Sequence, residues 1–128
     1  MKQIGNTKQE WHKKVWGSEH WVCNCPKYCS KFLTLNKNCF CSIHKHKIKD
    51  EHFLITYGVV LMQLGKEANR SIRMEKGDSI HIKPGMYHRF FGVTKAGILE
   101  TSTKHRENDS YRVMESGRLK NGQELRCR

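Results

Sequence analysis

Short runs of β-forming residues alternate with turn residues along this chain, and this alternation constrains the fold more than any other feature. From residue 20 onward, segments rich in Val, Ile, Thr and aromatic residues are separated by glycine, asparagine and proline. Helical periodicity is absent from almost the whole chain. Strands at this spacing, without helices between them, predict an antiparallel β-sandwich or β-barrel. The expected strands are 20–24, 28–35, 39–46, 53–57, 59–64, 71–74, 79–82, 88–91 and 97–103.

The composition fits one thin-walled β-domain. The chain has 128 residues, of which 37% are hydrophobic and 28% are charged. That length suits one domain, and a barrel needs only one inward-facing side on each strand. No apolar stretch approaches the length of a membrane span, and residues 1–10 lack the apolar core of a signal peptide. We therefore expect a soluble, cytoplasmic protein with no membrane partner.

The formal net charge of +12 raises association rates with anionic partners such as a sugar phosphate, a nucleotide-linked sugar or a nucleic acid. The lysines are scattered along the chain, and the sequence has no zinc-knuckle, RRM or helix-turn-helix signature. We interpret the charge as a solvated basic surface and do not expect nucleic-acid binding.

The six cysteines are expected to be free thiols in a reducing cytosol. The pairs Cys23/Cys25 and Cys39/Cys41 each lie on one face of a strand, so a thiolate metal site stays open as an alternative. We favour buried or half-buried thiols, because free cysteine packs as a small hydrophobic residue. Cys127 lies in the C-terminal tail.

Four residues form a candidate metal site. His44 and His46 are two positions apart, so both side chains point to the same side of a strand. Glu51 follows a polar turn, and His88 follows a Pro-Gly turn. Three neutral imidazoles and one carboxylate suit Mn, Fe, Co, Ni or Zn. The other histidines are assigned to the surface or core: His12, His20, His52, His81 and His105.

The order of these residues resembles the two motifs of the cupin superfamily. The first motif ends HxHxxxxExxxxxxG, which His44, His46, Glu51 and Gly58 match at every position. Its leading glycine is replaced by Asn38, which also tolerates a left-handed turn.

The second motif matches at Gly77, Gly85 and His88, whereas Lys83 replaces its proline and Gly92 its closing asparagine. The resemblance covers residues 16–113. It implies an all-β fold with a single cupin barrel, a jelly roll also called a double-stranded β-helix. An N-terminal arm (1–15) would precede this barrel and a C-terminal tail (114–128) would follow it. It also implies one divalent metal, with Mn or Zn favoured and Fe, Co or Ni as alternatives.

Cupins commonly pair through their sheets. Together with the Trp-rich N-terminal part of this chain, this implies a homodimer.

A narrower resemblance is to the small cupins related to sugar isomerases, which include the cupin part of type II mannose-6-phosphate isomerases and the D-lyxose isomerases. It rests on Trp16-Gly17, Lys31, the metal motifs and Tyr111-Arg112. In that group a lysine before the metal pair and a glutamate after the last histidine serve as acid/base groups. The resemblance implies that Lys31 and Glu100 have these roles in an aldose–ketose isomerisation through an enediolate.

Strand alternation extends this prediction to substrate binding. If Glu100 faces inward, Ser102 does too, with Ile98 below it. The expected substrate-binding residues are Tyr87, Arg89, Ser102 and Arg112.

Other interpretations remain open. Lys31 could extend outward, and Glu100 could pair with a lysine at the rim. The same metal ligands also suit an Fe(II) dioxygenase, and a cupin barrel can bind a sugar without catalysis.

Overall fold

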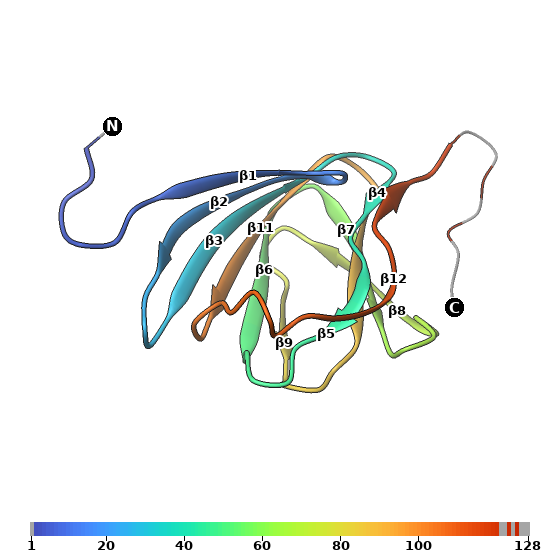
Figure 1. The fold of residues 1–128 in the computed structure, drawn as a ribbon. Helices are drawn as coiled ribbons and strands as arrows, with labels where there is room; N and C mark the ends of the chain where they lie inside the picture. Colours follow the sequence, from blue (N-terminus) through green and yellow to red (C-terminus); the bar gives the residue numbers. More distant parts are fainter. Residues whose placement is uncertain (1, 121–122, 124, 126–128) are drawn as a thin grey trace.

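The computed structural model describes residues 2–120, 123 and 125, and it consists of strands arranged in two antiparallel sheets that curve around a common interior (Figure 1). No helix occurs within the described residues. The strands are β1 (Glu10–Lys14), β2 (Gly17–Asn24), β3 (Cys29–Leu35), β4 (Cys39–Phe40), β5 (Ile43–Lys45), β6 (Glu51–Tyr57), β7 (Val59–Leu64), β8 (Arg70–Glu75), β9 (Ser79–Ile82), β10 (His88–Gly92), β11 (Ala96–Ser102), β12 (Tyr111–Met114) and β13 (Gly117–Arg118).

Every strand expected from the sequence is present, and the expected strand 39–46 is divided into β4 and β5. Both ends of the chain add strands to the sheets. β1 lies in the region assigned as an arm and forms a hairpin with β2. β13 lies in the region assigned as a tail and pairs with β4. Cys127 lies outside the described residues, and the other cysteines are free and buried or half-buried, as expected.

Strand pairing places the functional candidates opposite one another. The six-stranded sheet has the order β1-β2-β3-β11-β6-β9, and the second sheet joins β12, β5, β10, β4 and β13, with β7 and β8 continuing from β10. In the first sheet, Lys31 on β3 lies directly opposite Glu100 on β11. In the second sheet, His44 on β5 lies directly opposite His88 on β10.

The interior between the sheets is apolar at one end. Its core contains Leu33 and Leu35 of β3, Phe53 and Ile55 of β6, and Phe90 of β10. Lys31 shares the inward face of β3 with Leu33 and Leu35, while Phe32 and Thr34 face the other side, as the alternation in the sequence predicts. Polar side chains therefore enter the barrel on the same strands that build its core.

Turn residues have the backbone conformations that the motifs require. Gly58 has a φ of +76°, and Asn38, which replaces the first motif's leading glycine, has a φ of +65°. Asparagine is one of the few residues that enter this left-handed region at low cost. Asn38 therefore supports the same turn that glycine would.

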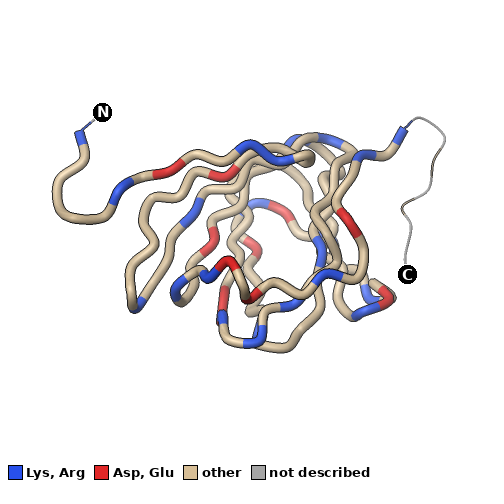
Figure 2. Tube along the Cα trace, in the orientation of Figure 1, with Lys and Arg blue, Asp and Glu red and all other residues tan. Residues whose placement is uncertain are grey.

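The outer surface is basic in a distributed way. Figure 2 shows lysine and arginine positions around the whole trace rather than along one face, as expected for a solvated basic surface.

On the six-stranded sheet, Trp11, Phe32 and Leu54 are exposed apolar residues on different strands. The homodimer stays a prediction. The described residues include no helix long and apolar enough to cross a membrane.

Candidate metal centre and cavity

Three histidines converge inside the barrel. His44 lies on β5, His46 is the first residue after the end of β5, and His88 is the first residue of β10. One ring nitrogen from each lies within 4.8 Å of those of the other two. These are the three histidines of the predicted four-residue site, and strand geometry explains why they meet. His44 and His46 lie on one side of β5 because they are two positions apart, and β10 places His88 opposite His44.

Hydrogen bonds orient all three rings in the same way. Each Nδ1–H donates to a backbone carbonyl: His44 to Ser42 at 2.8 Å, His46 to Asp109 at 2.8 Å and His88 to Met86 at 3.0 Å. A carbonyl can only accept, so the hydrogen is on Nδ1 and the lone pair is on Nε2. A metal-binding histidine usually donates its other ring N–H to an acceptor of the protein in this way.

Burial keeps these rings neutral. It lowers the pKa of His44 to about 3 and the pKa values of His46 and His88 to about 4 each. All three rings are therefore unprotonated near pH 7, which is the state that binds a metal ion.

Glu51 completes the site. Its Oε2 lies 3.4 Å from His46 Nε2 and 3.5 Å from His88 Nε2. Both Glu51 Oε2 and His88 Nε2 are buried and have no hydrogen-bond partner in the part of the chain that the structure describes. A carboxylate oxygen facing an imidazole lone pair is unfavourable unless a cation or a proton lies between them. The donor set thus fits a divalent ion bound by His44, His46, His88 and Glu51.

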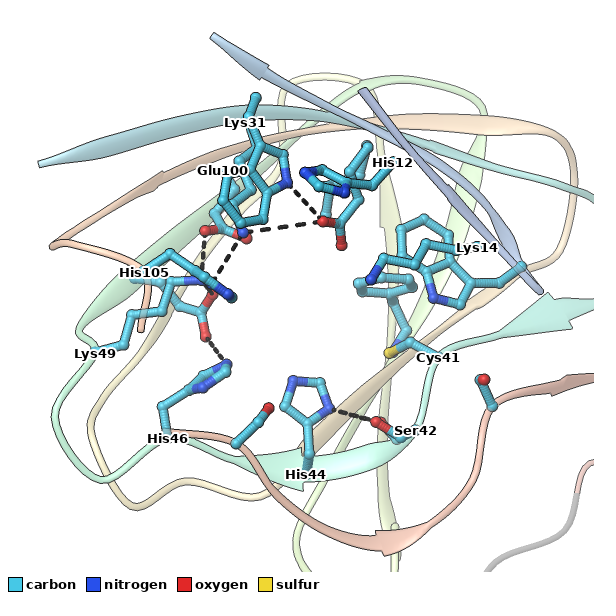
Figure 3. Close-up of a pocket in the computed structure, with 18 of the residues that line it drawn as sticks. His12, Lys14, Lys31, Cys41, Ser42, His44, His46, Lys49, Glu100 and His105 are labelled. Carbon is cyan, nitrogen blue, oxygen red and sulfur yellow. Dashed lines mark hydrogen bonds and ion pairs between the residues drawn. The ribbon is translucent and has the colours of Figure 1, made fainter. Parts of the chain in front are cut away.

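His44, His46 and Glu51 line a cavity of about 450 Å³ within the barrel (Figure 3). Lys31 and Glu100 enter the same cavity from β3 and β11. The two residues are 2% and 4% exposed, so Lys31 does not extend outward. Ser102 also faces inward, as strand alternation predicts, and its hydroxyl donates to Glu100 Oε2 at 2.9 Å.

Lys49 is a cavity residue that sequence reasoning missed. Its Nζ lies 2.6 Å from Glu100 Oε2 and 3.6 Å from Glu51 Oε1. Glu100 is therefore paired with a buried lysine rather than a rim lysine. Burial alone would raise the pKa of Glu100, but Lys49 and Lys31 outweigh it and lower this pKa to about 2. Burial likewise opposes the charge on Lys49, yet Glu100 and Glu51 raise its pKa.

Lys31 has a different environment. Burial lowers its pKa, and the carboxylates of Glu100 and Glu19 offset this only in part. Its Nζ lies 3.9 Å from the centre of the Trp21 ring and 3.9 Å from Glu19 Oε1. It also donates to Nδ1 of His105 at 3.1 Å. His105 had been assigned to the surface or core, and no spacing in the sequence distinguishes it.

The remaining predicted substrate-binding residues have separate locations. Arg112 lines the cavity. Among the described residues, Tyr87, Arg89 and Ser102 do not line it. Arg89 is completely buried on the face of β10 opposite His88, where it donates to Gln63 Oε1 and lies over the Phe40 ring. Strand alternation explains this placement, because His88 faces inward and its neighbour cannot.

The two sheets and the three-histidine cluster inside them define a cupin-type barrel with a candidate metal centre. Neither a protein-family model nor a curated protein sequence matches this chain. Solved structures do match its fold.

Pac13 from Streptomyces, described as a nucleoside dehydratase and solved with uridine, matches with a TM-score of 0.73 and 12% identity over 89% of this chain and 93% of its own. KdgF from Halomonas sp. matches with a TM-score of 0.68 and 14% identity over 77% of this chain and 89% of its own. The capsular polysaccharide assembling protein CapF from Staphylococcus aureus matches with a TM-score of 0.69 and 17% identity over 84% of this chain. That match covers only 34% of CapF. These similarities confirm the all-β cupin fold, while the link to sugar isomerases stays a prediction.

Proposed function

We propose that this chain is a metal-dependent cupin enzyme acting on a sugar or sugar phosphate by aldose–ketose isomerisation. One observation carries the proposal: the buried residues Lys31, Lys49 and Glu100 line the same cavity as His44 and His46 of the three-histidine cluster. An isomerisation of this kind requires proton transfer at carbon next to a stabilised oxygen anion. When bound by the three histidines and Glu51, a divalent ion would supply stabilisation of negative charge on the sugar oxygens.

In this proposal Glu100 is the base at carbon. Its low pKa keeps it ionised, which a base requires. Lys49 and Ser102 both hold its Oε2 atom, fixing the orientation of the carboxylate. A substrate that weakens the contact with Lys49 would increase the basicity of Glu100, because Lys49 is a principal cause of its low pKa.

Lys31 would bind or protonate a substrate oxygen. It lies directly opposite Glu100 in the strand pairing, so the two groups can act on neighbouring atoms of one ligand. Its lowered pKa favours proton exchange over a permanently fixed charge. Trp16, Leu33, Phe53 and Phe90 line the cavity beside these groups and limit the access of water.

Basic residues favour an anionic substrate. Arg112 and Lys14 line the cavity and come from two different strands. An arginine there can bind a phosphate group or sugar hydroxyls. We therefore favour a sugar phosphate over a neutral sugar.

A second candidate reaction is dehydration. Pac13, which matches nearly the whole of this chain, is described as a nucleoside dehydratase. A dehydration can begin with the same removal of a proton from carbon by Glu100. A nucleoside such as uridine therefore belongs in the substrate panel.

The test combines metal analysis with a substrate screen. The purified chain is analysed for bound metal, loaded with Mn or Zn, and assayed on free and phosphorylated aldoses and on nucleosides. For the substrate that is turned over, Glu100→Gln is expected to lower kcat by about 10²- to 10⁴-fold with full metal content, since it removes the base. Glu75→Gln, on the exposed strand β8, is the matched control and should retain wild-type activity.

Three outcomes would contradict the proposal. Unchanged isomerisation by metal-loaded Glu100→Gln would exclude Glu100 as the base. Oxygen uptake with bound Fe would favour the dioxygenase alternative. Measurable sugar affinity without turnover across the panel would indicate a non-catalytic binding protein.

A further inference from the structure

His105 connects a buried lysine to an exposed carboxylate. Lys31 Nζ lies 3.1 Å from His105 Nδ1, and His105 Nε2 lies 3.2 Å from Glu107 Oε1. An ammonium group can only donate, so Nδ1 accepts and the hydrogen of the neutral ring is on Nε2. That hydrogen is then donated to Glu107. The three side chains form one unbroken series of donors and acceptors.

The series runs from the interior to solvent. The side chain of Lys31 is 2% exposed, that of His105 is 17% exposed and that of Glu107 is 88% exposed. Lys31 therefore lacks direct contact with bulk water, whereas the Glu107 carboxylate is in direct contact with it. His105 lies between the two and lines the same cavity as the metal centre (Figure 3).

His105 is held in place by its backbone and by its ring. The backbone N–H of His105 donates to Asn24 Oδ1 at 2.8 Å, and Asn24 Nδ2 donates to the backbone carbonyl of His105 at 3.1 Å. Its ring packs against Trp21 with a centroid distance of 4.7 Å. Trp21 also lies under the Lys31 ammonium and donates to Glu19, so one indole positions both ends of the first hydrogen bond.

The charges around the pair favour proton exchange. Lys31 faces Glu19 from β2, Glu100 from β11 and Lys49 from the loop before β6. Burial lowers the pKa of His105, and the neighbouring lysines lower it further against the opposing effect of Glu107. The ring is thereby kept neutral, which leaves Nδ1 able to accept.

We propose that His105 relays protons between Lys31 and solvent through Glu107. In the outward pass, one N–H bond of the Lys31 ammonium breaks and a new N–H bond forms at His105 Nδ1. The Nε2–H bond breaks as its proton passes to the Glu107 carboxylate, which releases it to water. Lys31 is left as a neutral amine, His105 stays neutral as the other tautomer, and no oxidant or co-reactant is needed. The reverse pass restores the ammonium and the original tautomer.

The relay gives the proposed acid/base residue a path to solvent while substrate fills the cavity. The relay rests on the proposed function only in one respect, namely that the proton held by Lys31 is used in catalysis. The proton exchange itself is a property of the chain without substrate, so it can be tested separately.

The experiment uses nuclear magnetic resonance on the full chain loaded with Zn and carrying isotope-labelled lysine and histidine. The Lys31 ammonium signal is identified by its loss in Lys31→Arg. Proton–nitrogen correlations are expected to show His105 as the Nε2–H tautomer. Exchange of the Lys31 ammonium with water should slow by at least about tenfold in His105→Gln, which retains an acceptor but cannot relay a proton.

Two further variants keep the test independent of folding defects. Glu107→Gln changes an exposed side chain and should also slow Lys31 exchange. His20→Gln is the matched control, since His20 is bonded to Gln9 and not to Lys31, and it should leave the exchange rate unchanged. An Nδ1–H tautomer for His105, or an unchanged Lys31 exchange rate in His105→Gln, would overturn the relay. Neither result depends on whether any sugar is isomerised.

Discussion

Lys49 Nζ lies 2.6 Å from Oε2 of Glu100, and the two side chains are 4% and 6% exposed. The same ammonium approaches Oε1 of Glu51 at 3.6 Å. Lys49 therefore contacts both Glu100, the proposed base, and Glu51, the proposed metal ligand. Two buried carboxylates in one cavity would repel each other, and Lys49 offsets that repulsion.

Removing Lys49 should destabilise the fold strongly. Lys49→Met leaves the buried Glu100 carboxylate without the cation it contacts, and breaking a buried pair in this way costs about 3–5 kcal/mol. Urea unfolding of the metal-free chain measures the loss. The double variant Lys49→Met/Glu100→Gln should recover part of it, because the unpaired charge is also removed.

Lys47→Met is the matched control for Lys49. Lys47 is exposed two positions earlier and lies over the Tyr111 ring, so its replacement should cost no more than about 1 kcal/mol. Equal stability of Lys49→Met and Lys47→Met would show that the buried pair contributes little.

Metal binding should release a proton from Glu51. Burial and repulsion by Glu100 raise the pKa of Glu51 to about 8 in the metal-free chain, against a partial opposing effect of Lys49 and Lys31. Below that pH the carboxyl carries a proton that a metal ion must displace. Affinity for Zn should therefore increase with pH up to about 8 and level off above it.

The histidines should not contribute to this pH dependence above pH 5, because the pKa values of His44, His46 and His88 are about 3, 4 and 4. Titration calorimetry in buffers of different ionisation enthalpy counts the protons released. Glu51→Gln should bind Zn more weakly and without proton release near pH 7. Proton release that persists in Glu51→Gln would contradict the assignment.

Asp109 should support both the metal loop and a metal ligand. Its carboxylate accepts from the backbone N–H groups of Lys47, Ile48 and Lys49, and its carbonyl accepts from His46 Nδ1. Burial raises its pKa, but these backbone donors outweigh burial and lower it. Asp109→Asn turns one acceptor oxygen into a donor, which should cost about 1–3 kcal/mol.

The same substitution should weaken metal binding by about 10- to 100-fold, the usual effect of losing a residue that orients a ligand. Unfolding and Zn titration measure the two effects. Asp78→Asn is the control, because Asp78 accepts the backbone N–H of Glu75 in an exposed turn. Wild-type Zn affinity in Asp109→Asn would show that the loop holds its shape without the carboxylate.

Residues on strands could be placed from the sequence. Alternation fixes which side chains share a face: it predicts that Lys31 lies on the same face as Leu33 and Leu35, and the structure confirms this. It also predicts that Ser102 shares the face of Glu100, and both are buried on β11. The same rule excludes Arg89 from the cavity once His88 is inside.

Residues on loops could not be placed in this way. Lys49 is one of several lysines in its segment, and its inward orientation depends on Asp109, which is 60 positions away in sequence. His105 is held by Asn24, 81 positions away. Contacts of such long range leave no periodic signal. The buried charge network and the hydrogen-bonded series Lys31–His105–Glu107 are therefore visible in the structure alone.

The two glycine turns of the cupin motifs should differ in their tolerance of a side chain. Gly58 and Gly77 both have positive φ, at +76° and +91°. A Cβ at Gly77 would have nothing within 4 Å, whereas one at Gly58 would lie 2.2 Å from the Lys95 carbonyl oxygen. Gly77→Ala should lower the free energy of unfolding by about 1–2 kcal/mol, the cost of holding a residue with a Cβ in the left-handed conformation. Gly58→Ala should lower the free energy of unfolding by about 1–3 kcal/mol more than Gly77→Ala does, because the backbone of Lys95 must move. Thermal unfolding of both variants in parallel checks the difference, and equal losses would show that the chain relaxes around Gly58 without strain.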